Sequence, residues 1–167
     1  VIEAEQPIEI LSYEFLADRA GAGQYRGGAP YCREYRFTEK EAILQVRSDR
    51  RAIRPYGLYG GRPGKMSMNY MNPDGENKPL PSKPTMTIHA GDVFRHELAG
   101  GGGWGDPFTR DPEAVLNDVR NELVSVEAAR NDYGVAVNIN AWTVDAAATD
   151  ALRAQRKDPE TPKVAWE

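Results

Sequence analysis

The sequence predicts an α+β fold, with mainly antiparallel β-structure in residues 1–98, a glycine-rich corner at residues 99–107 and short helices after it. The first part consists of short apolar runs separated by Gly and Pro, of which the chain has 16 and 12, as is typical of strands joined by turns. After residue 107 the apolar period becomes helical. A chain of 167 residues is long enough for one domain with a sizeable core. We therefore expect a single domain with a helical part at 108–157 and a charged tail at 158–167.

Strands are expected wherever apolar and polar residues alternate in the first part. These runs are Pro7–Leu16, Tyr31–Phe37, Ala42–Arg47, Lys65–Met71, Thr85–His89 and Val93–Leu98. The four residues Thr38–Glu41 separate the second run from the third, which predicts an antiparallel hairpin. Met66, Met68 and Tyr70 share one face of their run, and we expect that face to pack in the core.

Helix starts and stops mark the second part. Asp111 before Pro112 predicts an N-cap followed by proline at the first helical position. Ser125 is expected to cap a second helix that Gly134 ends, and Thr143 a third helix from Val144 to about Gln155. Between the last two, residues 135–139 (VAVNI) read as a strand.

The glycine run Gly100–Gly103 is the most unusual stretch of the chain. Glycine loses more backbone entropy on ordering than any other residue. Such a run is favoured where φ is positive or where other groups lie close against bare main chain. A phosphate-binding loop needs Gly-Lys-Ser/Thr leading directly into a helix, whereas Trp104-Gly105-Asp106-Pro107 follows here. The local pattern therefore predicts a buried corner between strand and helix.

Composition and charge indicate which kinds of partner and which cellular compartment to expect. The formal net charge of −4 gives no global electrostatic support for binding nucleic acid or an anionic membrane. No apolar stretch approaches the roughly 20 residues of a membrane helix, and the acidic start lacks the apolar region of a signal peptide. We expect a cytoplasmic protein with no nucleic-acid or membrane partner. Cys32 is the one cysteine, so no internal disulfide forms, and we interpret it as a small packed residue.

Two groups of side chains have chemical interest. His89 and His96 are the two histidines, but a catalytic zinc site needs three protein ligands, so no metal site is expected in this chain. His96, four residues before the glycine run, is a candidate for acid–base work, with packing as the alternative. The basic residues of Ser48–Arg51, with Arg54, fit either a solvated turn or an anion site.

Several stretches, taken in order, resemble the hydantoinase B/oxoprolinase family. Arg19-Ala20 stands where the family usually has Ser-Gly, but the resemblance covers nearly the whole chain. The matching stretches are Asp18–Gly28 with Arg33-Glu34, Asp49-Arg50 with Gly57–Gly61, the hallmark Gly100–Pro107, and a C-terminal signature of Asp118-Val119, Val124-Ser125, Ala128 and Tyr133–Val135.

The resemblance implies that this chain corresponds to the C-terminal part of a B-type subunit. Such subunits act with an A-type subunit that binds ATP and Mg, and the family's metal ligands lie in the remaining N-terminal part. The implied activity is ATP-dependent hydrolysis of a cyclic amide such as hydantoin, 5-oxoproline or a lactam. A subunit of a ketone carboxylase and a non-catalytic assembly module are the alternatives.

The same resemblance indicates where a site would form. We expect His96 and Asp106 as catalytic residues. The residues expected to bind a small-molecule substrate are Arg26, Arg50, Gly101, Gly102, Gly103 and Trp104. In this interpretation the arginines hold a carboxylate or acyl phosphate, and glycine N–H groups stabilise an oxyanion.

Overall fold

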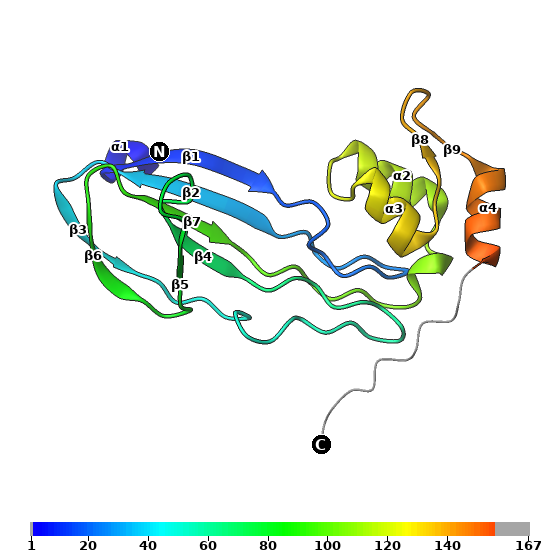
Figure 1. Cartoon of the computed structure of the whole chain (residues 1–167), viewed down its shortest axis with the longest axis horizontal. Coiled ribbons are helices and arrows are strands. Elements are labelled where there is room, and N and C mark those ends of the chain that lie inside the picture. Colours follow the sequence, from blue (N-terminus) through cyan, green and yellow to red (C-terminus); the bar gives the residue numbers. More distant parts are fainter. Residues whose placement is uncertain (1, 156–167) are drawn as a thin grey trace, which may run out of the picture.

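The computed structural model describes residues 2–155 and has the α+β architecture that the sequence predicts. Figure 1 shows most of the strands, with the first short helix, at one end of the molecule, and the other helices, with the last two short strands, at the other end. Long extended loops that run side by side join the two ends. Within residues 2–155, none of the helices is long and apolar enough to cross a membrane.

The main sheet has five strands in the order β1-β2-β7-β4-β5, and all neighbours are antiparallel. Its strands are β1 (Ile8–Phe15), β2 (Tyr31–Phe37), β7 (Val93–Glu97), β4 (Met68–Met71) and β5 (Lys78–Leu80), and a short helix α1 (Ile2–Glu5) precedes them. The register of β1 shifts between Ile10 and Ser12. This bulge explains why the apolar residues of the run change from even positions, Ile8 and Ile10, to odd positions, Tyr13 and Phe15.

A second sheet of two strands, β3 (Glu41–Gln45) and β6 (Thr85–His89), accompanies the main sheet. The predicted hairpin between the second and third runs is therefore wrong. Both edges of β2 are already occupied, by β1 and by β7, so the turn after Phe37 carries the chain into the other sheet instead. A core of Val46, Met71, Leu80, Ile88 and Phe94, drawn from both sheets, holds them together.

The burial of β4 reverses the expected face. Ser67, Asn69 and Met71 are buried, whereas Met66, Met68 and Tyr70 are half-buried. The polar residues can be buried because they have partners: Ser67 Oγ donates to Asp49 O, and Asn69 Nδ2 donates to Ser48 Oγ at 2.8 Å. A period of two marks a strand but does not say which face is covered.

The helical part begins with a short 3₁₀ helix η1 (Pro107–Thr109) and contains α2 (Pro112–Arg120), α3 (Val126–Tyr133) and α4 (Ala146–Ala154). Asp111 and Ser125 cap α2 and α3 as predicted, and Gly134 ends α3 with φ of 63°. Two predictions are corrected. The expected strand shortens to β8 (Val137–Asn138), and Thr143 lies in β9 (Thr143–Val144) while Asp145 caps α4. Residues 156–157 of the predicted helical part and the predicted tail lie outside the described residues.

Candidate functional site

The glycine run lies at the centre of a bundle of extended segments that we call the glycine bundle, formed by residues 19–28, 55–65 and 99–105. Backbone hydrogen bonds join the run to several segments at once. Gly101 N donates to Gly28 O at 2.9 Å, Gly103 N to Arg62 O at 3.0 Å, and Gly105 N to Leu58 O at 2.9 Å. The N–H groups of Gly101 and Gly103 are therefore used to hold the bundle together.

Close approach of main chain to main chain explains the glycines. A Cβ at Gly102 would overlap Tyr56 O, and a Cβ at Gly103 would overlap Ala22 O. Gly100–Gly103 do not have positive φ, whereas Gly105 does, at 72°. Of the two reasons expected for a glycine run, the close contact therefore accounts for the run itself and the left-handed backbone only for its end.

A buried ion-pair cluster attaches the bundle to the helices. Arg26 donates to both carboxylate oxygens of Asp118, at 3.0 and 3.1 Å, and Arg110 donates to the same carboxylate at 2.9 Å. Asp118 is 5% exposed. Burial of Tyr133, on α3, raises its pKa to about 12 although Arg110 and Arg26 lower it. Arg26 thus serves an internal contact, in which its guanidinium donates to Asp118 and to Gly27 O.

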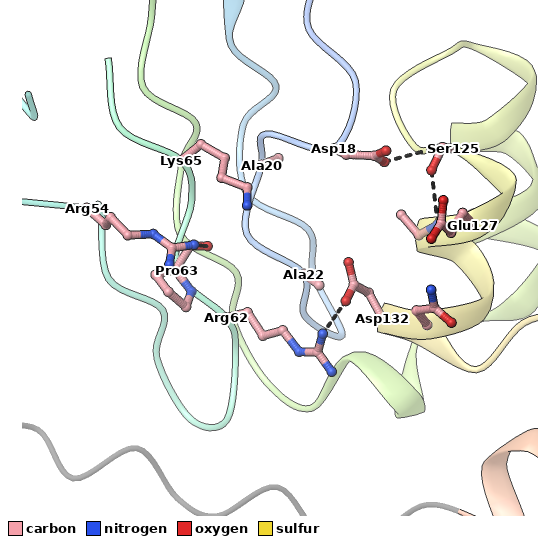
Figure 2. Close-up of a pocket in the computed structure, with 12 residues that line it drawn as sticks. Asp18, Ala20, Ala22, Arg54, Arg62, Pro63, Lys65, Ser125, Glu127 and Asp132 are labelled. Carbon is pink, nitrogen blue, oxygen red and sulfur yellow. Dashed lines mark hydrogen bonds and ion pairs between the residues drawn. The ribbon is translucent and has the colours of Figure 1, made fainter. Parts of the chain in front are cut away.

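A pocket of about 510 Å³ opens between the glycine bundle and α3 (Figure 2). The bundle and the adjoining Arg54 supply the cations of its wall, and α3 with its N-terminal cap supplies polar and acidic groups. The charged or polar residues that line the pocket are Asp18, Arg54, Arg62, Lys65, Ser125, Glu127, Asn131 and Asp132. The two walls therefore carry opposite charge.

Specific contacts fix most of these side chains. Asp18 Oδ1 accepts a hydrogen bond from Ser125 N at 2.8 Å, and Arg62 forms an ion pair with Asp132 across the pocket (Figure 2). Arg54 donates to two bundle carbonyls, one of them Gly64 O at 2.9 Å. Lys65 is different: it is exposed, and among residues 2–155 its ammonium group has no hydrogen bond or ion pair. Lys65 is therefore the cation of this wall that is available to an anionic group.

His96 lies away from this pocket, on β7, with a fixed protonation pattern. Asn69 is fully buried and its Nδ2 donates to Ser48 Oγ and Pro81 O. Its Oδ1 is consequently the acceptor at 2.6 Å from His96 Nδ1, so Nδ1 carries the proton and Nε2 has the lone pair. Burial, assisted by the charge of Arg33, lowers the pKa of His96. Its ring is thus a neutral proton acceptor at neutral pH.

The remaining predicted residues lie in three places. Arg50 lines a second pocket, of about 790 Å³, between residues 48–53 and 79–83. Asp106 caps η1, where its carboxylate accepts from Phe108 N at 3.0 Å. Trp104 is 43% exposed and contacts the rings of Tyr25 and Tyr59.

The structure thus brings together part of the predicted set. Gly101, Gly102, Gly103, Trp104 and the backbone of Arg26 share the bundle. His96 and Arg50 belong to the β-rich part, and Ser48 connects their surroundings. Ser48 Oγ accepts a hydrogen bond from Asn69, which also contacts His96, and Ser48 lines the second pocket together with Arg50.

Half of the residues that line the pocket beside α3, including Arg62, Lys65 and Glu127, were not singled out by the sequence. The other half were: Arg54 belongs to the predicted basic cluster, and Asp18, Ala20, Ala22, Ser125 and Ala128 belong to the stretches that resemble the family. Within the described part of the chain, no group of three His, Cys, Asp or Glu side chains is arranged to hold a metal ion.

Comparison with known proteins gives these features a context. Residues 1–107 match the family model described as hydantoinase B/oxoprolinase. The chain is 37% identical over 155 residues to the uncharacterized protein MJ0963 of Methanocaldococcus jannaschii. It is 32% identical over 159 residues to caprolactamase subunit beta of Pseudomonas jessenii. Each match covers 92% of this chain and 27% of the relative, so the chain spans about a quarter of their length.

Solved structures agree with this relationship. The ATP-dependent caprolactamase of Pseudomonas jessenii superimposes with a TM-score of 0.78 and 31% identity, over 91% of this chain and 27% of the other. A nucleotide-free acetone carboxylase superimposes with a TM-score of 0.70 and 25% identity, over 89% of this chain and 24% of the other. With the family model covering residues 1–107 and the glycine bundle built from the stretches that characterise it, the chain belongs to the hydantoinase B/oxoprolinase family.

Proposed function

We propose that this chain is a component of an ATP-dependent amidohydrolase that acts on a cyclic amide. The observation that carries the proposal is the likeness to caprolactamase, in sequence at 32% identity and in structure at a TM-score of 0.78. The likeness to acetone carboxylase is weaker by identity and by TM-score. In this proposal an A-type partner subunit binds ATP and Mg, and the rest of a B-type subunit completes the site and holds any divalent metal.

The pocket beside α3 is the part of that site we assign to this chain. A carboxylate or acyl phosphate would be attracted by the unpaired Lys65 ammonium in this pocket, whose lining also includes Arg62. Glu127 and Asp132 on the opposite wall suit an amine or amide nitrogen. His96 and Asp106 stay as proposed catalytic residues. Arg26, Arg50, Gly101, Gly102, Gly103 and Trp104 stay as proposed substrate-binding residues.

The runner-up is a ketone carboxylase subunit, which the likeness to acetone carboxylase favours. The same pocket would then hold a bicarbonate-derived or phosphorylated anion. A second alternative is an assembly module without a catalytic role, which the use of Gly101 and Gly103 N–H groups inside the bundle favours.

The test is turnover by the complete complex purified from its native source. We expect release of ADP that requires hydantoin, 5-oxoproline or caprolactam. Lys65→Ala should lower kcat/KM about tenfold or more, the loss expected for one hydrogen bond to a charged group, without dissociating the complex on size exclusion. Lys78→Ala, at an exposed position of β5 outside the pocket, is the matched control and should not change kcat/KM.

The alternatives give different results. Consumption of ATP with acetone and bicarbonate, and with none of the cyclic amides, would support the carboxylase. Dissociation of the complex by Lys65→Ala would instead support the assembly module.

A further inference from the structure

An exposed apolar surface lies where three segments of the glycine bundle turn. We call it the aromatic patch: Tyr25, Leu58, Tyr59 and Trp104. Their exposed fractions are 63%, 51%, 79% and 43%, respectively. The Trp104 ring contacts the rings of Tyr25 and Tyr59, with centroids 5.6 and 5.5 Å apart. The patch therefore joins residues that are about 80 positions apart in the chain and contains no charged side chain.

The backbone holds the patch rigidly. Tyr25 and Trp104 exchange backbone hydrogen bonds of 3.0 and 2.9 Å. Leu58 N donates to Gly103 O and Leu58 O accepts from Gly105 N, both at 2.9 Å. Tyr59 and Gly60 turn the chain with φ of 51° and 91°. A left-handed tyrosine is unfavourable by itself and is retained where the surroundings impose it, often at functional surfaces.

A monomer rarely keeps such a surface in water. Aromatic residues without charge at the centre are typical of protein interfaces, and the interfaces of permanent partners are the more apolar ones. Rigid presentation also lowers the entropy lost on docking. The aromatic patch has the chemistry of one half of a permanent contact.

The relatives indicate what covers it. They carry the region equivalent to this chain in polypeptides of which it makes up 27%. Their remaining three quarters are permanently attached to that region, and permanent contacts are the ones that apolar surfaces suit, whereas transient contacts are more polar.

We propose that the aromatic patch docks against the remainder of a B-type subunit, whether that remainder is supplied in the same polypeptide or in a separate one. The occupant presents an apolar surface with acceptors for the tyrosine hydroxyls and the Trp104 indole N–H. The proposal holds for a hydrolase and for a carboxylase alike. A negative result in the cross-linking test below would therefore leave the proposed activity standing, and a negative result in the turnover test above would leave the docking proposal standing.

The test is site-specific photo-cross-linking in the native complex. Benzoylphenylalanine replaces Tyr59 in one variant and Tyr25 in a second, and mass spectrometry identifies the peptide joined to each. Glu76, exposed in the turn between β4 and β5, is the control position. We expect Tyr59 and Tyr25 to cross-link to sequence similar to the part of caprolactamase subunit beta that this chain does not match, with at least tenfold more product than Glu76.

Other results would overturn the proposal. These are cross-links from both positions to the ATP-binding subunit, cross-links to a second copy of this chain, and no cross-link from either variant although circular dichroism shows it folded. Two positions are used so that a folding defect in one variant leaves the other decisive.

Discussion

At the scale of single residues, the glycines of the bundle differ sharply in what they tolerate. A Cβ at Gly102 would overlap Tyr56 O, a main-chain atom of the bundle, whereas a Cβ at Gly28 meets nothing within 4 Å. We expect Gly102→Ala to lower the free energy of unfolding by about 2 kcal/mol or more, the range of overpacked cores. Urea denaturation followed by circular dichroism measures this loss.

Gly28→Ala is the matched control, in the same bundle and outside the left-handed region. It should be neutral or stabilise by about 0.4–1 kcal/mol, because alanine reduces the entropy of the unfolded chain. Equal losses in both variants would show that general glycine flexibility, and not close main-chain contact, explains the run.

His96 makes stability depend on pH in a defined direction. Its folded pKa lies below the unfolded value, because burial and then the charge of Arg33 disfavour the imidazolium. The unfolded state therefore binds more protons as pH falls below about 6.5, the ordinary value for histidine. The stability that neutral His96 contributes to the folded state is fully present above that pH, and it is lost as the pH falls towards the folded pKa.

The variant His96→Gln, which keeps a donor for Asn69 but does not titrate, isolates this effect. We expect the free energy of unfolding of the wild type, minus that of the variant, to decrease as the pH falls from 7.5 to 5.5, as measured by urea denaturation. Titration of the carboxylates affects both proteins and cancels in the difference. A difference that stays constant over this range would contradict the lowered pKa.

At the scale of elements, local signals predicted some boundaries well. Tyr31–Phe37 and Thr85–His89 are strands over the predicted residues, and α2 and α3 begin at the predicted caps. Alternation of side chains and capping act within a few residues, so they can be read from the chain.

Pairing of strands acts over longer distances and was predicted less well. β2 pairs with β1 and β7, and β3 pairs with β6, whose partner residues lie 40 to 48 positions away. The choice of Ser67, Asn69 and Met71 for the buried face of β4 depends on Ser48 and Asp49, which lie in another segment. Neither partner choice has a local signature.

The candidate site was predicted only in outline for a related reason. The glycine run marked a place of close contact, but a bundle of extended segments has no period that indicates which segments meet. The pocket depends on contacts such as Asp18 with Ser125, separated by 107 positions, and Arg62 with Asp132. Family resemblance gave the chain its context, and the arrangement of the pocket wall came from the structure.

At the scale of the whole molecule, the glycine bundle connects two separate cores. One core lies between the sheets, and the other packs Ala22 of the bundle against apolar residues of the helical part. The bundle is also joined to that part by Arg26, which pairs with Asp118, and by Gln24 O, which accepts from Arg110 at 3.1 Å. Next to the bundle, Asp18 N donates to Leu123 O at 3.2 Å. In the sequence, segments of the bundle lie on both sides of each main-sheet strand except β1. Neither core can therefore open without disturbing the bundle.

This arrangement predicts that the chain unfolds in one cooperative step. In a Trp142→Phe/Trp166→Phe background, Trp104 fluorescence reports the bundle and ellipticity at 222 nm reports the helices, and we expect the same urea midpoint from both. Asp118→Asn leaves two half-buried arginines without their buried carboxylate, so it should lower both midpoints together and reduce stability by about 3 kcal/mol. Asp74→Asn, in an exposed turn, is the control and should change little. In Asp118→Asn, the midpoint from ellipticity could instead fall to lower urea while the midpoint from Trp104 fluorescence stays unchanged. In that case the helices would be an independently folding unit, and the bundle would not couple the two cores.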